Sequence, residues 1–153
     1  MSEPRPQSLS PHFSNLIGQK VVFEKLLTNA VTGEKKIYAL YATVPSENPV
    51  VVMADLSVLG FLAGALVGLP EPEIRSRITA PELDDVLKDA INEIFNVATP
   101  VISTQERAVL KTISENKSEL GDAAEQILSK PHREVSFNVT INNYKAGRFH
   151  ILS

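Results

Sequence analysis

Residues 79–99 read TAPELDDVLKDAINEIFNVAT and carry the clearest secondary-structure signal of the chain. Apolar residues recur there at the spacing of one helix face, which predicts an amphipathic helix over residues 79–99. The apolar face consists of Leu83, Val86, Leu87, Ala90, Ile91, Ile94, Phe95 and Ala98. Thr79 and Glu82 fit a capping box at the start of the helix, and Pro100 ends it. Such a helix buries one side and leaves the other in solvent.

Residues 50–69, upstream of this helix, are the most apolar stretch of the chain, and Asp55 is their single charge. A stretch of this length could span a membrane, but no Lys/Arg cluster flanks it. The favoured interpretation is a buried strand over residues 50–53, followed by a core helix over residues 56–69. Asp55 or Ser57 would cap the start of this helix, and Pro70 and Pro72 would end it. The helix contains three glycines at four-residue intervals, Gly60, Gly64 and Gly68. They predict a smooth face that another element can approach closely.

Strand signals lie on both sides of these helices. Alternating or β-branched runs predict strands over residues 20–28, 35–44, 134–141 and 148–152. Turns over residues 29–33 and 142–147 would join them into two hairpins. Residues 107–113 fit a strand or a helix, and residues 118–129 fit a short helix that Pro131 ends. This order predicts an α+β fold, with long helices packed on a mainly antiparallel sheet. Both halves hold a strand pair and a long helix, which is a faint sign of an internal repeat.

The composition is that of a globular protein with a core of its own. The chain has 153 residues, of which 43% are hydrophobic and 22% charged. That length suits a single domain. Residues 1–12 contain Pro4, Pro6 and Pro11 among polar residues, and they are predicted to be a flexible tail. The domain itself is then expected to span residues 13–153.

Charge and cysteine content exclude several function classes. The net charge is −3 and no basic patch dominates, which argues against a nucleic-acid partner. The absence of cysteine excludes disulfides, thiolate catalysis and cysteine-based metal sites. His12, His132 and His150 have no second ligand at i+2 or i+4, so no metal site of the chain's own is predicted. The polar N-terminus does not read as a signal peptide, and we expect a cytoplasmic protein with no membrane partner.

The polar side of the predicted helix is the main candidate for function. Asp89, Glu93 and Asn96 fall within about 60° of one another around the helix axis, roughly opposite the apolar face. Glu82 and Asp85 extend the same side. A solvated acidic face is the usual meaning of such a stripe. Two weak signs favour a functional role: asparagine is a mediocre helix former, and Glu93 has no basic residue four positions later.

Residues 89–96 read DAINEIFN and match the D/S-x-x-x-E-x-x-N pattern of the CheC/CheX/FliY chemotaxis phosphatases. The surrounding sequence is similar too, because residues 65–70 (ALVGLP) and 81–85 (PELDD) resemble the segments that precede the motif in that family. The resemblance covers residues 50–99 reasonably and is loose elsewhere. One copy of the motif is found, as in the CheX type, so the chain resembles a single CheX-like domain.

This resemblance implies a CheC-like fold and a phosphatase that hydrolyses the aspartyl phosphate of a CheY-type receiver domain. Asn96 would hold the attacking water, and Glu93 would pair with a lysine of the receiver. Asp85, Asp89 and Asn92 would contact the same partner. Mg²⁺ would be supplied by the receiver, and the chain would need no cofactor of its own. The CheX type also implies a homodimer.

A non-catalytic function remains the alternative. The same fold could serve as a binding or scaffold domain that docks a receiver or a flagellar-switch protein. Asn92 stands where family helices often have glycine, and Phe95 stands where they often have alanine. Pro100 ends the helix soon after Asn96. These departures motivate a docking surface without turnover.

Overall fold

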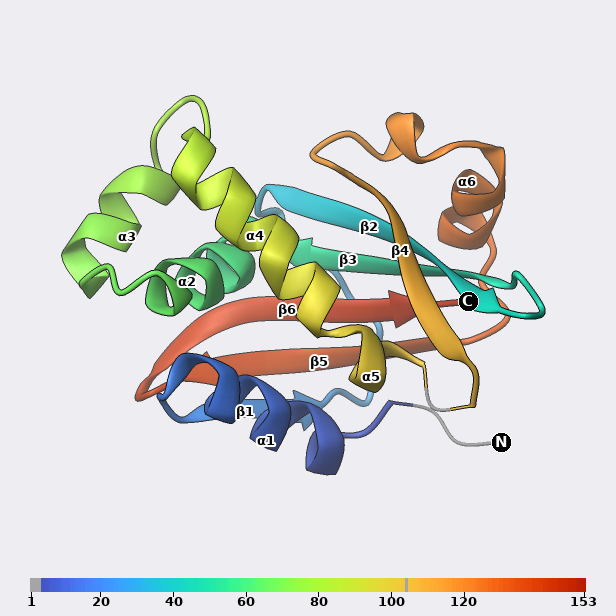
Figure 1. Ribbon diagram of the computed structural model, residues 1–153, viewed down its shortest axis with the longest axis horizontal. Coiled ribbons are helices and arrows are strands. Elements are labelled where there is room, and N and C mark those ends of the chain that lie inside the picture. The colour runs from blue at the N-terminus through green and yellow to red at the C-terminus, as the bar shows by residue number, and fades with distance from the viewer. Residues whose placement is uncertain (1–3, 104) are drawn as a thin grey trace.

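A six-stranded antiparallel sheet forms the framework of the computed structural model, which describes residues 4–103 and 105–153. The strands are β1 (Val21–Lys25), β2 (Lys36–Val44), β3 (Pro49–Asp55), β4 (Arg107–Ser114), β5 (Glu134–Ile141) and β6 (Tyr144–Leu152). Their order across the sheet is β1-β5-β6-β3-β2-β4. Long helices cover this sheet (Figure 1). The α+β prediction is confirmed, and residues 107–113 belong to a strand.

The strand order has a hidden symmetry. Exchanging β1 with β4, β2 with β5 and β3 with β6 gives the same order read backwards. Helix α1 (Pro6–Ile17) precedes the end strand β1, and helix α4 (Asp85–Val97) lies upstream of the opposite end strand β4. The faint repeat in the sequence therefore corresponds to a repeated topology.

Residues 6–17 form a helix, which corrects the prediction of a tail that extends to residue 12. Leu9, Phe13 and Ile17 make the buried face of α1, and the Phe13 ring stacks on Phe23 with 5.3 Å between centroids. Pro6 is tolerated because the N–H groups in the first turn of a helix have no acceptor within the helix, so the N–H that proline lacks is not needed there. Residues 1–3 of the predicted tail lie outside the described residues.

The predicted hairpin between residues 20–28 and 35–44 is wrong. β1 pairs with β5, whereas β2 pairs with β3 and β4. The segment between β1 and β2 instead crosses the sheet, where Asn29 accepts a hydrogen bond from Ser136 on β5 and the Ala30 carbonyl accepts one from Arg148 on β6. The C-terminal hairpin is confirmed, but β6 starts at Tyr144, before the predicted Arg148.

Residues 50–69 divide into strand β3 and helix α2 (Leu56–Leu66). No helix among the described residues combines the length and the apolar character that a bilayer span requires. Neither predicted cap is made by a side chain, because Asp55 binds Lys36 Nζ at 2.8 Å and Ser57 donates to the Ala146 carbonyl. The carboxylate of Asp55 is fully buried, and a buried charge is costly unless it is paired. The ion pair with Lys36 therefore takes precedence over a capping hydrogen bond to α2.

Helix α3 (Glu71–Ile78) was not expected, because Pro70 and Pro72 suggested only the end of a helix. Both prolines lie where a new helix starts and are tolerated there. Helix α3 packs against the smooth face of α2. A Cβ atom built on Gly64 would lie 2.5 Å from Cγ1 of Ile74, and one on Gly60 would overlap Ile78.

Helix α4 begins later than predicted. Asp84 is its N-cap and accepts a hydrogen bond from the Leu87 N–H at 2.9 Å. The Thr79–Glu82 capping box is wrong, since Thr79 Oγ1 donates to the Arg75 carbonyl at the end of α3. The short helix α5 (Thr99–Ile102) follows, with Pro100 in its first turn.

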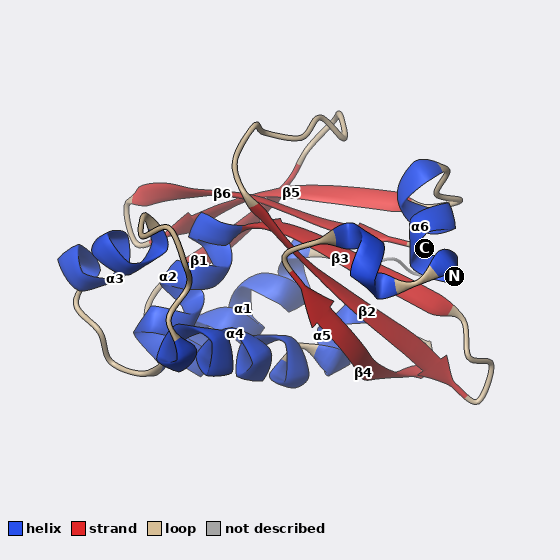
Figure 2. Ribbon diagram, turned by 90° about the horizontal axis from the view of Figure 1, so that it is seen from above, coloured by secondary structure: helices blue, strands red, loops and turns tan. Residues whose placement is uncertain are grey.

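Two faces of the sheet carry separate cores. Helices α1, α2, α4 and α5 lie on one face, and α6 (Asp122–Ser129) lies on the other (Figure 2). The second face is covered near α6 by a small cluster of Val51, Leu120, Ala124 and Leu152. Leu120 belongs to a 3-10 turn, η1 (Lys117–Leu120), so the single helix predicted over residues 118–129 is broken at Gly121.

Candidate functional site

Helix α4 presents two distinct sides. Its buried side consists of Leu87, Ala90, Ile91, Ile94 and Phe95, as the apolar stripe predicted, although Val86 is 55% exposed. The five predicted site residues are all exposed: Asp85, Asp89, Asn92, Glu93 and Asn96. They follow the spacing of one helix side, so the structure brings them together on one surface stripe of α4.

A buried hydrogen bond from the sheet holds the backbone of the α4 stripe in place. The Tyr41 hydroxyl of β2 donates a hydrogen bond of 2.6 Å to the Phe95 carbonyl of α4, between Glu93 and Asn96 in sequence. Burial raises the pKa of Tyr41, so the hydroxyl keeps its proton and remains a donor. Helix α4 also packs against α2. The backbone that carries Glu93 and Asn96 is therefore fixed to the sheet.

The polar groups of the stripe are available for a partner. Within the part of the chain that the structure describes, the side chains of Asp89, Glu93 and Asn96 make no hydrogen bond and no ion pair. Asn96 thus offers both the acceptor and the donor of its amide to an external group. Of the departures from the family pattern, Phe95 is 1% exposed and belongs to the core, whereas Asn92 lies on the stripe.

A cleft of about 410 Å³ lies beside the stripe. Asp89 and Asn92 line one wall, and Ser114, Glu115 and Glu119 from β4 and the following segment line the other. The latter three residues were missed by the sequence analysis, because their proximity to α4 depends on the position of β4 in the sheet. Glu93 and Asn96 are not among the lining residues of this cleft.

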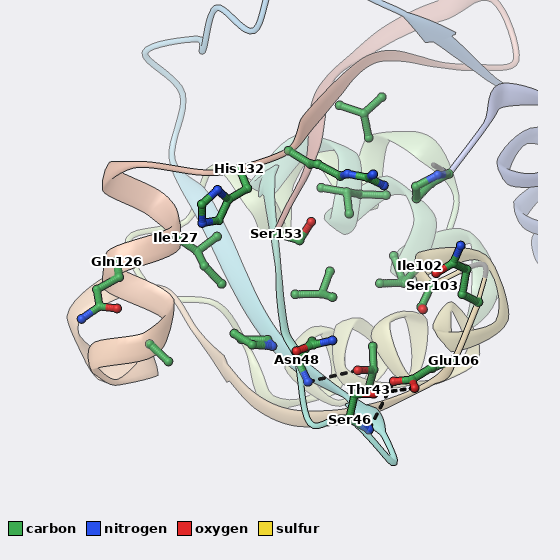
Figure 3. Close-up of a pocket in the computed structure, with 18 of the residues that line it drawn as sticks. Thr43, Ser46, Asn48, Ile102, Ser103, Glu106, Gln126, Ile127, His132 and Ser153 are labelled. Carbon is green, nitrogen blue, oxygen red and sulfur yellow. Dashed lines mark hydrogen bonds between the residues drawn. The ribbon is translucent and has the colours of Figure 1, made fainter. Parts of the chain in front are cut away.

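A larger hollow of about 920 Å³ lies elsewhere, between the β2–β3 turn, α6 and the segment that precedes β4 (Figure 3). None of the five predicted site residues lines it. Sequence reasoning gave no sign of this hollow, since its walls come from segments that are far apart along the chain.

Among residues 4–103 and 105–153, no three histidine, aspartate or glutamate side chains gather in a way that could hold a metal ion. His150 is fully buried and its Nδ1 lies 2.7 Å from the Ser136 hydroxyl. This histidine is part of the sheet packing and lies outside the α4 stripe.

No family model and no curated protein matches the chain. Several solved structures do. FliM of H. pylori, in its complex with SpeE, matches with a TM-score of 0.66 and 10% identity, over 96% of this chain and 80% of that one. Thermotoga maritima FliY matches with a TM-score of 0.61 and 14% identity, over 95% and 81%. FliM of H. pylori in complex with FliG matches with a TM-score of 0.60 and 11% identity, over 98% and 86%.

The chain has the CheC-like fold. The fold that the family resemblance implied is therefore confirmed. At identities of 10% to 14% the likeness concerns the fold alone. The fold alone does not determine activity or partners, which depend on the residues of the site that it carries.

Proposed function

We propose that this chain is a CheX-like phosphatase that hydrolyses the aspartyl phosphate of a response-regulator receiver domain. The observation that carries the proposal is the exposed pair Glu93 and Asn96 on α4, one turn apart, without partners in the described chain. The D-x-x-x-E-x-x-N spacing and the CheC-like fold support it.

The proposed reaction needs little chemistry from this chain. Water attacks the phosphorus, the bond to the aspartyl oxygen breaks, and the products are inorganic phosphate and the free carboxylate. The Asn96 amide accepts a hydrogen bond from this water and orients it, which is a positioning effect. Glu93 pairs with a lysine of the receiver and fixes the register of docking. Mg²⁺ on the receiver neutralises the phosphoryl charge, so this chain needs no cofactor of its own.

The rest of the stripe serves recognition in this proposal. Asp85, Asp89 and Asn92 extend the contact surface along α4 and add negative charge to it. The CheX type further implies a homodimer, which light scattering coupled to gel filtration measures directly.

The first prediction concerns Asn96. Receiver domains phosphorylated with acetyl phosphate are mixed with the protein, and phosphate release is followed. Asn96→Ala should slow release about 100-fold, because the water loses its orienting amide. Glu93→Gln should raise KM more than it lowers kcat, because it removes an ionic contact with the partner.

The chain offers a matched control for this experiment. Asn15 is an exposed asparagine on α1, the helix that corresponds to α4 in the repeated topology. Asn15→Ala should leave the rate unchanged. Equal rates for wild type and Asn96→Ala would refute the catalytic role.

A second candidate is a docking module without turnover. Two of the FliM structures that share the fold were solved as complexes, one with FliG and one with SpeE, so these relatives bind proteins of different kinds. This alternative predicts that a receiver binds the α4 stripe, that Asp89→Lys weakens binding, and that phosphate release equals that of the receiver alone. Accelerated release would exclude it.

A further inference from the structure

The hollow of about 920 Å³ lies away from the α4 stripe and is independent of the proposed phosphatase activity. Its volume of about 920 Å³ falls within the range of pockets that hold small organic ligands. The β2–β3 turn and Glu106 form one wall, and α6 with residues 130–133 forms the other (Figure 3). The strand ends between these walls form the floor.

The floor of the hollow is apolar and consists mainly of side chains that are buried in the core. Val50, Val135 and Ile151 contribute to it from β3, β5 and β6, and each is less than a tenth exposed. Ile102 and Ile127 add apolar surface from α5 and α6. An apolar ligand body that covers this floor would remove its exposed atoms from water.

On one wall, Glu106 is already paired with Ser46. The Ser46 hydroxyl donates to Glu106 at 2.7 Å, and the Ser46 N–H donates to the same carboxylate at 3.3 Å. Hydrogen bonds from the side chains of Ser46 and Thr43 lower the pKa of Glu106, so it is ionised at neutral pH. This wall repels a second anionic group.

The opposite wall carries two positively charged residues, Lys130 and Arg133. Lys130, His132 and Arg133 line it, and their side chains make no hydrogen bond or ion pair within the described residues. Their backbone is nevertheless held in place, because the N–H groups of His132 and Arg133 donate to the Ser153 carbonyl at 2.9 and 3.0 Å. The backbone of Arg133 is thus held in place, while its guanidinium has no partner within the described residues.

We propose that this hollow binds a small amphiphilic anion, with its apolar body on the floor and a single carboxylate or sulfonate head against Lys130 and Arg133. Charge complementarity selects the head, and Glu106 restricts the ligand to one negative end. The occupant is a free small molecule, since the apolar floor is recessed between two walls.

Decanoate below its micelle concentration is the probe. Decanoate is added stepwise to the protein while the amide chemical shifts are measured by NMR. The shifts should show saturable binding, with the largest changes around Val50, Ile127 and Arg133. Decylammonium, which has the same chain and the opposite charge, should bind at least about tenfold more weakly. Equal affinity for the two probes, or no saturable binding of decanoate, would overturn the proposal.

Charge-reversal variants locate the head group. Lys130→Glu with Arg133→Glu should weaken decanoate binding at least about tenfold, by loss of attraction and gain of repulsion. The matched control is Lys20→Glu with Lys111→Glu, which makes the same change in net charge at exposed sites outside the hollow. Equal weakening by both pairs would show that only overall charge matters and would reject the site.

The Ala123→Trp variant tests the same site if the charge-reversed variant does not fold. Ala123 is an exposed lining residue of α6, so the indole can fill the hollow without disturbing the core. This variant should abolish decanoate binding while its melting temperature stays that of wild type. Sedimentation of the protein with vesicles of anionic phospholipid would assign the positive wall to a membrane surface instead, and would contradict a free ligand.

Discussion

His150 is a titratable residue in the middle of the sheet, and its side chain is fully buried. Its Nδ1 shares a hydrogen bond with Ser136, while Nε2 has no partner among the described residues. Burial lowers the pKa of His150 to about 4; nearby Asp55 opposes this shift, and Lys36 and Arg148 add to it. The ring is therefore neutral at pH 7.

This neutral histidine predicts a pH dependence of stability. Its pKa is about 4 when folded and 6.5 when unfolded, so protons bind preferentially to the unfolded chain. The free energy of unfolding should be unaffected by His150 above pH 6.5. It should fall by about 1.4 kcal/mol per pH unit as the pH drops from 6.5 to 4, or about 3 kcal/mol altogether.

Urea denaturation at pH 7 and pH 4.5 measures this effect. In His150→Asn the amide can replace Nδ1 at the Ser136 hydroxyl and does not titrate. The variant should lose about 2–3 kcal/mol less than wild type between the two pH values. The same loss in both proteins would show that other groups cause the pH dependence.

At the scale of elements, the contact between α2 and α3 depends on two glycines. Three atoms of the buried Ile74 side chain lie within 3.4 Å of the position that a Cβ on Gly64 would occupy. Helix α3 can approach α2 this closely only because no side chain stands at that point. The glycine spacing in the sequence predicted the smooth face, and the structure shows which helix uses it.

Gly64→Ala should therefore destabilise the protein by about 1–2 kcal/mol, even though alanine favours helix by about 1 kcal/mol. Urea denaturation gives the change in free energy. Gly33→Ala is the control, because a Cβ there meets no atom within 4 Å. In an Ile74→Ala background the Gly64→Ala cost should disappear; if it persists, the overlap with Ile74 is not its cause.

The success of sequence reasoning differs between elements for physical reasons. The stripe of α4 was predicted because buried and exposed residues follow the helical period along the 13 residues of this helix. Helix α1 was missed because Pro6 and Pro11 suggested a break, while its buried face has only three large apolar residues. Partners far along the chain, such as Ser114 and Glu119 beside Asp89, leave no local signal at all.

At the scale of the whole molecule, α1 closes the core at the β1 end of the sheet. Its residue Phe13 lies against Phe23 and Phe149, which come from β1 and β6. The helix is thus part of the same core that supports α4. A chain that begins at residue 18 would expose these rings to water.

Deletion of residues 1–17 should abolish the cooperative thermal transition, because it uncovers several buried aromatic side chains at once. Circular dichroism during heating measures the transition. Deletion of residues 1–3 leaves α1 intact and should keep the wild-type melting curve. A cooperative transition in the shorter chain at an unchanged temperature would show that α1 is dispensable.

The interleaved strand order also dictates when the sheet can form during synthesis. β1 lies at one end of the sheet and its neighbour is β5, which begins only at Glu134. A nascent chain on the ribosome can therefore form the β2–β3 hairpin early, but β1 cannot pair until β5 (Glu134–Ile141) has emerged. Its apolar residues Val21 and Phe23 stay without their sheet partner during that time. The sheet is therefore completed in a late folding step, which joins β1 to the hairpin of β5 and β6.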